Sequence, residues 1–396
     1  MVLNSKRSLK ILHSVESYHP ELGGMQELVK QVSERLVKRG HIVTVVTSAS
    51  NDRREKNING VSIKSFNLSG NLVNGINGNQ EEYLNYVLKS DFDIIINWMA
   101  QSWSTDILLP HLEKIKYKKG SVVTGFSGFY KEEYKEYFHN MKSWMKSYDI
   151  NFFSSNNYRD INFSKSIGLE NNVVVLNGAS KSEFENNTIN FRKKIGIKAN
   201  KKIILHVGSL TGTKGQEEAV EIYKKAKIKN SVLVFIGNRT DRLLGYYGKI
   251  HRYIQMPVLK YLYRSNIVAL GAQDRELIVA AYKAADLFLF PSNTECSPIV
   301  IVECLASKTP FLATDVGNIK ELSELTKAGE IMPTKRNEID FGFPLINESA
   351  EQLKELIKNN SKLEELGNNG YKSFLEKFTW DKVVDDYEQN YYKIIK

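Results

Sequence analysis

The chain has 396 residues, 42% of them hydrophobic and 25% charged, an ordinary globular composition that is long enough for two cores. No apolar stretch approaches the roughly 20 residues that span a bilayer, and no signal-peptide pattern follows the N-terminus, so we expect a cytoplasmic protein. The net charge of +10 favours an anionic partner such as a nucleotide or an anionic lipid, whereas no motif or arginine-rich tail points to nucleic acid.

The first part of the chain alternates strands with helices. An apolar strand over Leu9–Val15 precedes a turn at Glu21–Gly24, and apolar residues at helical spacing follow from Met25 to Val37. Arg39–Gly40 ends this helix, and a strand over His41–Thr47 is apolar on both faces. This βαβ order predicts a parallel sheet covered on both sides. Further strands are predicted over Val61–Phe66, Asp93–Asn97, Ser121–Thr124, Ile150–Ser154 and Val173–Leu176.

The strand–helix pattern restarts after a polar segment. Ser182–Asn190 lacks periodicity and is predicted to be the interdomain linker. A buried strand over Lys202–Gly208, a helix around Ala219–Ala226 and a strand over Val232–Ile236 come next. Strands are also predicted over Ile267–Leu270, Leu287–Phe290 and Phe311–Thr314, and a closing helix over Trp380–Lys396. Tandem βα domains of this kind place ligands at the carboxyl ends of their strands.

The most informative segment runs from Phe290 to Glu303. A strand ends at Phe290, and a helix is predicted to begin with Ser297 as N-cap and Pro298 at the first helical position. The free N–H groups of its first turn, including Ile299, and the helix dipole favour an anion. Glu295 and Glu303 lie on either side of this helix start, where carboxylates accept hydrogen bonds from hydroxyl groups. A nucleotide sugar has a matching layout, because its diphosphate lies between the ribose hydroxyls and the sugar hydroxyls.

Glu295 to Glu303, read with the preceding "AADLFLFPS" and the following "VECLAS", resembles the E-x7-E motif of retaining GT-B glycosyltransferases of family 4. The resemblance implies that Glu295 contacts the transferred sugar and that Glu303 binds the donor ribose. The alternative is a solvated helix start with two surface acids.

Other segments resemble the family in the same order along the chain. Gly23-Gly24 resembles the glycine-rich loop that approaches the donor diphosphate, although such a pair alone is more often a plain turn. Asn177-Gly178 resembles the end of the first domain. Gly208–Gly215 resembles the loop in which Lys214 meets the diphosphate, and Asn266–Gly271 the strand whose end, at Gly271, cradles the base. Trp380-Asp381 and the closing helix resemble the C-terminal helix that returns to the first domain.

Two positions depart from the family pattern. The diphosphate loop carries Ser209 where the family has arginine, and Arg239 is the nearest candidate to replace that cation. After the Ser121–Thr124 strand the family has His-Gly near the reacting sugar, and the best-fitting residues are Ser127-Gly128. The bond-making geometry is therefore less well defined by the sequence than the nucleotide site.

An aromatic and basic stretch lies in the first half of the chain. Aromatic and methionine residues between Tyr134 and Tyr148 alternate with lysines such as Lys142 and Lys146. One interpretation is a helix that docks on an anionic membrane or a lipid-linked acceptor. The other is that the aromatic face packs on the sheet, and the sequence leaves both open.

These observations predict an α/β protein of GT-B type, with two Rossmann-like domains facing a central cleft. Residues 1–180 and the closing helix 380–396 would bind the acceptor, and residues 190–375 the nucleotide sugar. The resemblance implies a retaining transfer of a hexosyl or N-acetylhexosaminyl group, from a UDP-sugar most readily, to a glycan or lipid-linked acceptor in cell-surface polysaccharide synthesis. The site would hold no metal and no cofactor, and would work at the inner face of the membrane.

Two other functions are compatible with the sequence. Ser127 and Ser209 fit an inactive glycosyltransferase-like partner subunit that binds a glycan or nucleotide sugar without turnover. A nucleotide-sugar epimerase of the same fold is a weaker alternative, since the acidic and histidine residues it needs are not found in place. Assembly into a homo-oligomer is compatible with any of the three.

Overall fold

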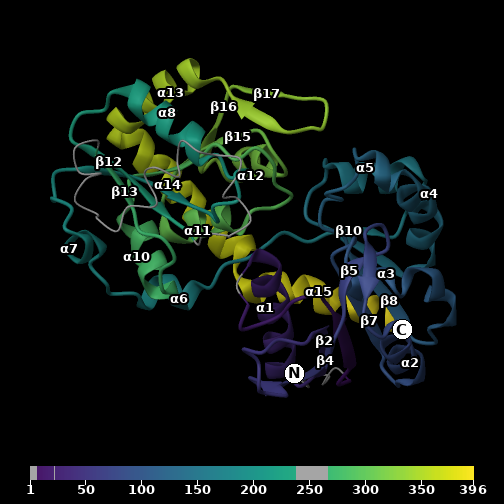
Figure 1. The fold of residues 1–396 in the computed structure, drawn as a ribbon. Coiled ribbons are helices and arrows are strands. Elements are labelled where there is room, and N and C mark those ends of the chain that lie inside the picture. Colours follow the sequence, from purple (N-terminus) through teal and green to yellow (C-terminus); the bar gives the residue numbers. More distant parts are fainter. Residues whose placement is uncertain (1–6, 22, 238–265) are drawn as a thin grey trace. The chain divides into compact units, whose positions relative to one another are not determined.

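The computed structural model describes residues 7–21, 23–237 and 266–396. The chain divides into two compact units, each described by itself below. Unit 1 comprises the residues up to Asn177 together with Trp380–Lys396, and unit 2 comprises Gly178–Thr379 (Figure 1). Arg239, the proposed substitute for the missing arginine, lies outside the described residues.

Unit 1 contains an eight-stranded sheet with the strand order β10-β9-β8-β7-β1-β2-β4-β3. Its strands are parallel except for β3, which pairs with β4 in antiparallel fashion. The central β1 pairs Leu12 with Thr44 of β2 on one side and with Ile95 of β7 on the other. The strands are β1 (Lys10–Ser14), β2 (Ile42–Ser48), β3 (Asn57–Ile58), β4 (Val61–Phe66), β7 (Ile94–Trp98), β8 (Lys118–Val122), β9 (Ile150–Phe153) and β10 (Asn172–Val174), with β5 (Ser69–Asn71) and β6 (Gly75–Asn77) forming a separate hairpin.

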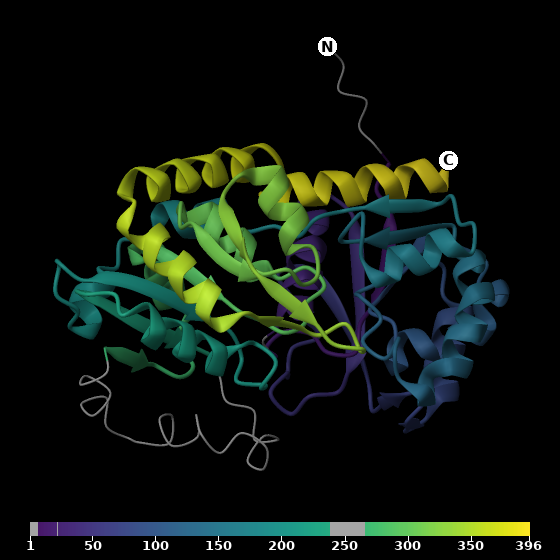
Figure 2. The ribbon, with the colours of Figure 1, turned by 90° about the horizontal axis from the view of Figure 1, so that it is seen from above.

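Two helices of unit 1, α1 (Gly24–Lys38) and α15 (Trp380–Ile395), each bury an apolar stripe. In α1, Leu28, Val29, Val32 and Leu36 are buried, and Gly40 ends the helix in a left-handed conformation that favours glycine. The closing helix α15 buries Val383, Val384, Tyr387 and Tyr391, as its periodicity predicts, and lies along unit 1 in Figure 2. The unit-1 helices are α1 (Gly24–Lys38), α2 (Gln80–Lys89), α3 (Trp103–Asp106), α4 (Lys135–Trp144), α5 (Arg159–Ser166) and α15 (Trp380–Ile395).

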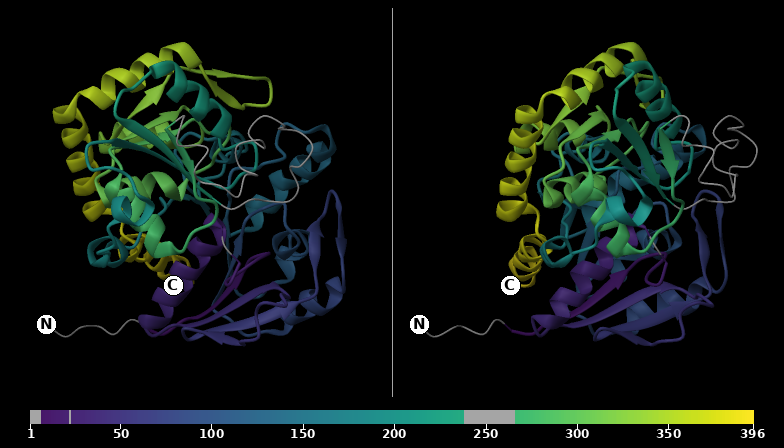
Figure 3. Two further views of the ribbon diagram at one scale, coloured as in Figure 1. Left: turned by 60° about the vertical axis from the view of Figure 1, so that its left-hand side comes forward. Right: turned by 90° about the vertical axis from the view of Figure 1, so that its left-hand side faces the viewer.

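Unit 2 contains a six-stranded sheet with the order β13-β12-β11-β14-β15-β16, parallel throughout. All residues of β14 and nearly all of β11 are buried, because helices cover both faces of a parallel sheet. The strands are β11 (Lys202–Val207), β12 (Ser231–Ile236), β13 (Ile267–Ala269), β14 (Leu287–Phe290), β15 (Phe311–Thr314) and β16 (Gly329–Met332). The antiparallel hairpin of β17 (Thr334–Arg336) and β18 (Gly342–Pro344) projects from the unit (Figure 3).

The described helices of unit 2 surround this sheet. Ile222 and Ala226 of α8 pack with Leu353 and Ile357 of α13 in the core of the unit. The helices are α6 (Lys181–Asn186), α7 (Phe191–Ile195), α8 (Gln216–Ala226), α10 (Arg275–Ala284), α11 (Ile299–Ser307), α12 (Ile319–Thr326), α13 (Ile346–Lys358) and α14 (Asn360–Ser373). No helix in the described parts of the chain is both long and apolar enough to cross a membrane.

One prediction about chain organisation is wrong and one strand is displaced. The supposed linker Ser182–Asn190 is largely the helix α6, which lies inside unit 2, whereas the unit boundary falls at Asn177 and Gly178, the pair predicted to end the first domain. This helix buries Phe184 alone, so it leaves no periodic signal in the sequence. The strand predicted over Ser121–Thr124 is present but begins earlier, as β8 at Lys118–Val122, because the N–H groups of Lys118 and Lys119 donate to Asp93 O (3.2 Å) and Asp149 Oδ2 (2.8 Å).

Candidate functional site

The loop between β11 and α8 in unit 2 is fastened to the segment after β14. Thr213 O accepts the Asn293 N–H (2.8 Å) and the Ser292 hydroxyl (3.0 Å). Gly215 has φ +73°, and a Cβ there would lie 1.9 Å from Pro291 O, so only glycine fits without a shift of backbone. The two loops predicted to share the donor are therefore in direct contact.

Lys214 and Glu295 form an ion pair in this place. Lys214 Nζ lies 2.7 Å from Glu295 Oε1, and the Ser292 hydroxyl donates to the same oxygen at 2.7 Å. The Glu295 side chain is 8% exposed and that of Lys214 is 28% exposed. Burying a carboxylate without such partners is costly, whereas the ammonium has three N–H groups and so can also donate to an anionic ligand. Glu295 is thus no solvated surface acid.

The start of α11 differs from the prediction by one residue. The helix begins at Ile299, and Pro298 occupies the N-cap position with an extended backbone (φ −74°, ψ 120°). Ser297 is not the N-cap residue, and its hydroxyl accepts a hydrogen bond from Asn318 Nδ2 (3.0 Å) in the loop after β15. Pro298, which is the N-cap residue, offers no side-chain hydrogen bond to the N–H groups of the first turn.

Gly317 fixes the other side of this segment. It has φ +58°, and a Cβ there would lie 2.5 Å from Cys296 O. The next residue, Asn318, donates its N–H to the same Cys296 carbonyl at 2.9 Å. The loop after β15 therefore holds residues 295–297 in place from the side opposite Lys214's loop.

Glu303 lies on α11 and is buried, with its side chain 7% exposed. Its Oε1 forms an ion pair with Arg275, the first residue of α10. The sequence analysis did not identify Arg275. In the sequence, Arg275 is only an arginine that follows Asp274. An arginine in that position says nothing about a partner 28 residues away.

Glycines bring the remaining loops of the donor side together. Gly237 N–H donates to Gly271 O (3.0 Å), and a Cβ on Gly237 would lie 1.9 Å from Gly208 O. The side-chain amide of Gln216 donates to the backbone carbonyls of Gly208 and Ser209, and the distance to Ser209 O is 3.2 Å. The carboxyl ends of β11, β12 and β13 therefore converge, as a nucleotide site in an open α/β sheet requires.

The predicted residues of unit 1 lie at the ends of β1 and β8. Gly23 precedes α1 in extended backbone, and Gly24 is the first residue of the helix; both are exposed. Ser127 is exposed, and its hydroxyl donates to Gln101 Oε1 (3.3 Å), which also accepts the Gly128 N–H (3.2 Å). Sequence reasoning missed Gln101, whose backbone is left-handed (φ +62°).

Gln101 belongs to a buried polar network. Its N–H donates to the Tyr137 hydroxyl (3.0 Å), which donates to Asp106 Oδ1 (2.8 Å). Asp106 Oδ2 accepts the Leu72 N–H at 3.0 Å. Burial raises the pKa of Asp106 to about 6, against the lowering effect of these hydrogen bonds. The network ties the Ser127–Gly128 segment to the core of unit 1.

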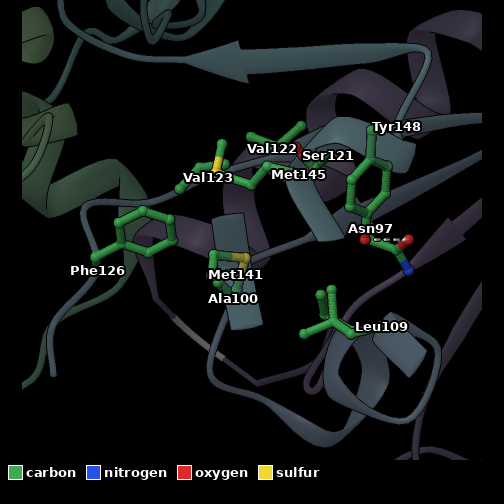
Figure 4. A pocket seen from close by; sticks show the side chains of 11 residues that line it. Asn97, Ala100, Leu109, Ser121, Val122, Val123, Phe126, Met141, Met145 and Tyr148 are labelled. Carbon is green, nitrogen blue, oxygen red and sulfur yellow. Dashed lines mark hydrogen bonds between the residues drawn. The ribbon is translucent and has the colours of Figure 1, made fainter. Parts of the chain in front are cut away.

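A small cavity lies beneath this segment, between Phe126 and the Asn97–Tyr148 hydrogen bond (3.1 Å) (Figure 4). Met141 and Met145 line it together with the ends of β7 and β8. Its free volume of about 10 Å³ admits about one water molecule and no sugar. A second cavity of about 470 Å³ lies after β1 and β2 and is lined by polar groups that include His19, Asp52 and Arg54.

The aromatic stretch faces the interior of unit 1. Tyr134, Tyr137, Phe138, Met141, Met145 and Tyr148 belong to its hydrophobic core, while Lys142 and Lys146 are exposed. This arrangement favours packing on the sheet as the role of the aromatic face. Contact of the lysine face with an anionic membrane stays a prediction.

Truncating this face is expected to destabilise unit 1. Phe138 lies 5.0 Å, ring to ring, from both Phe126 and Phe129, so Phe138→Ala should lower the free energy of unfolding by about 3–5 kcal/mol. Lys142, which is exposed on the same helix, gives the control. Lys142→Ala should change the free energy of unfolding by no more than about 0.5 kcal/mol. Urea unfolding of both variants measures the difference, and equal effects would contradict the packing interpretation.

Two family models match the chain, one after the other. "Glycosyltransferase Family 4" matches residues 22–160 and "Glycosyl transferases group 1" matches residues 187–373. The chain therefore belongs to the glycosyltransferases of group 1 and family 4 type, and the predicted GT-B fold of two Rossmann-like units is confirmed.

Two relatives match at low identity, one over nearly the whole chain and the other over little more than half of it. An uncharacterised glycosyltransferase of Methanocaldococcus jannaschii is 26% identical over 98% of both chains. The processive diacylglycerol alpha-glucosyltransferase of Acholeplasma laidlawii is 26% identical over 57% of this chain and 61% of its own length.

Solved structures agree on the fold. Sucrose-phosphate synthase from Thermosynechococcus elongatus superimposes with a TM-score of 0.77 at 17% identity, over 98% of this chain and 99% of that one. The Anabaena protein HepE in complex with UDP and glucose gives 0.72 at 16% identity, over 96% and 99%.

Proposed function

We propose that the protein is a retaining glycosyltransferase that moves a hexosyl or N-acetylhexosaminyl group from a UDP-sugar to a hydroxyl of a glycan, glycolipid or glycopolymer. The observation that supports it most is the grouping of Lys214, Glu295 and the start of α11 at the carboxyl ends of the unit-2 strands. UDP as the nucleotide is supported by HepE, a protein of the same fold that was solved with UDP and glucose.

Each group has a task in this proposal. Lys214 and the α11 N–H groups stabilise the charge that develops on the diphosphate as the anomeric C–O bond breaks. Glu295 accepts a hydrogen bond from a sugar hydroxyl, and Glu303 from the ribose. The acceptor oxygen forms the new bond on the same face of the sugar, and its proton passes to the departing diphosphate. These residues would supply charge neutralisation without a metal.

The acceptor would bind to unit 1. The polar lining of its 470 Å³ cavity and the exposed Ser127 suit a ligand rich in hydroxyl groups. We therefore propose a glycan portion as the part of the acceptor that this unit recognises, in the synthesis of a cell-surface polysaccharide or glycoconjugate at the cytoplasmic face of the membrane.

The two carboxylates should be distinguishable by calorimetry with free UDP. Glu303→Ala should weaken UDP binding by roughly 10–100-fold, since hydrogen bonds to a charged group are worth about 1.5–3 kcal/mol. Glu295→Ala should leave UDP affinity within about threefold but slow turnover strongly, because the sugar is absent from UDP. Unchanged UDP binding by Glu303→Ala would show that Glu303 does not bind the ribose. Normal turnover of Glu295→Ala would show that Glu295 does not contact the sugar.

An inactive partner subunit is the second candidate. Ser209 and Ser127 stand where the family carries a cation and a histidine, and Ser127 hydrogen-bonds to Gln101. If the protein is an enzyme, we expect it to release UDP from a UDP-sugar by hydrolysis. This release can be measured without knowing the acceptor. A purified protein that binds the nucleotide sugar but never cleaves it, with or without candidate acceptors, would favour the partner subunit.

A further inference from the structure

Arg275 bridges two carboxylates from different helices of unit 2. Its Nη1 donates to Glu303 Oε1 on α11, and its Nη2 and Nε lie 2.8 Å and 2.9 Å from Glu183 Oε2 on α6. The helices α6 and α11 both pack against α10, which carries Arg275 at its first position. The guanidinium also lies 5.8 Å from the centre of the Phe184 ring.

This arrangement places a cation beside the buried carboxyl group of Glu303. A carboxylate that is 7% exposed pays a large desolvation penalty unless a cation is held beside it. Although burial lowers the pKa of Arg275, the charges of Glu303 and Glu183 together raise it above its usual value. Arginine suits this position, because its planar fork can direct N–H groups to two carboxylates at once, which a lysine ammonium does with less defined geometry.

We propose that Arg275 is a positioning residue of the donor site, which holds Glu303 Oε1 so that the second oxygen of the carboxylate is presented to the ribose hydroxyls. Glu183 holds the guanidinium from its other edge and sets its orientation. This inference rests on the proposed function, because it takes the ligand of Glu303 to be the ribose of a nucleotide. It adds to that function a residue that determines how tightly ribose, as opposed to the diphosphate, is held.

The test compares UDP with 2′,3′-dideoxy-UDP, which lacks the ribose hydroxyls, by calorimetry on the full chain. Arg275→Ala should weaken UDP binding by roughly tenfold or more and leave dideoxy-UDP binding unchanged. Arg275→Lys should fall between the two, and Glu183→Gln should show a smaller, equally UDP-selective loss. A general effect on folding would weaken both ligands alike and cannot produce this selectivity.

A matched control is available in the same unit. Arg192 forms an ion pair with Asp286 (3.1 Å) just before β14, at the amino ends of the strands. Arg192→Ala removes an arginine–carboxylate pair of the same kind but should leave the affinities for both ligands unchanged. Thermal unfolding of all variants without ligand identifies any that fail to fold, and Arg275→Lys and Glu183→Gln then carry the test.

Three outcomes count against the proposals, in different ways. Wild-type affinity of Arg275→Ala for UDP would overturn the role of Arg275 and leave the glycosyltransferase proposal intact. Equal weakening of UDP and dideoxy-UDP would do the same, since it would mean that Arg275 acts on the diphosphate or the fold. A wild-type protein that binds no UDP would overturn the proposed donor, and the inference with it.

Discussion

Replacement of Lys214 by alanine is expected to slow the release of UDP from a UDP-sugar by roughly 10²–10³-fold, the loss typical of one electrostatic donor to a developing anion. Ser209 replaces the second cation of the family loop, so Lys214 is the one cation of Gly208–Gly215. Its ammonium can bridge Glu295, 2.7 Å away, and a diphosphate oxygen at the same time. The effect should appear mainly in kcat, because charge on the diphosphate grows as the bond to the sugar breaks.

The ion pair with Glu295 requires a control for stability. Lys214→Ala leaves a carboxylate that is 8% exposed and still accepts from the Ser292 hydroxyl, and a buried charge without its cation destabilises a fold. The double variant Lys214→Ala/Glu295→Gln removes that charge. If the double variant regains the thermal stability that Lys214→Ala loses, the unpaired buried charge causes the destabilisation, and the activity of Lys214→Ala measured well below its unfolding temperature then reports catalysis. The readout of the double variant is thermal stability, because loss of the Glu295 carboxylate is itself expected to slow turnover.

Ser209→Arg provides the complementary change. The Ser209 carbonyl is held by Gln216 (3.2 Å) and by the Thr211 N–H (2.8 Å), so the backbone of the loop does not depend on the serine side chain. An arginine there should be neutral or mildly activating, and should partly rescue Lys214→Ala. Hydrolysis of a UDP-sugar, followed through released UDP, is measured for the wild type, Lys214→Ala, Ser209→Arg and the double variant Lys214→Ala/Ser209→Arg. Full activity of Lys214→Ala would refute the role proposed for this lysine.

Among substitutions that add one methyl group to the loop Gly208–Gly215, Gly215→Ala is expected to lower the free energy of unfolding most. Two effects add: the left-handed φ of +73° disfavours any Cβ by about 1–2 kcal/mol, and the Cβ would lie 1.9 Å from Pro291 O. The clash is with backbone and cannot be relieved by a side-chain rotation. We expect a loss of more than about 3 kcal/mol in the free energy of unfolding, together with loss of UDP binding.

Two glycines separate the conformational effect from the steric one. Gly168 (φ +72°) in unit 1 and Gly271 (φ +64°) in unit 2 have the same left-handed backbone, but among the described residues no atom beyond the chain neighbours lies within 4 Å of a Cβ on either. Their alanine variants should therefore show the conformational penalty of about 1–2 kcal/mol alone. Urea unfolding of the three variants tests this, and a Gly215→Ala effect no larger than that of Gly168→Ala would show that the loop yields easily.

Much of the fold followed from local patterns. The strands at Leu287–Phe290 and Phe311–Thr314 are observed as predicted, because a strand buried on both faces must be apolar throughout. The stripe of Val383, Val384, Tyr387 and Tyr391 likewise predicted the buried face of α15. Such signals depend on neighbours in sequence, so one chain is enough to read them.

The errors occur where a distant residue decides a local outcome. Ser297 is an acceptable N-cap by type, but its hydroxyl is engaged by Asn318, 21 residues further on, and α11 begins at Ile299 instead. The helix α6 was mistaken for a linker because Phe184 is its one buried residue and its other contacts are polar.

By itself, then, the sequence determined the α/β architecture and the family and singled out Lys214, Glu295 and Glu303, since these reside in periodicity and in contiguous motifs. Only the tertiary structure decided how these groups are paired, and it alone identified Arg275 as the partner of Glu303. Lys214 meets Glu295 across 81 positions and Arg275 meets Glu303 across 28, because parallel strands bring loops from separate βα units to one edge of the sheet. No local pattern encodes a distance of 2.7 Å between side chains that are so far apart in the chain.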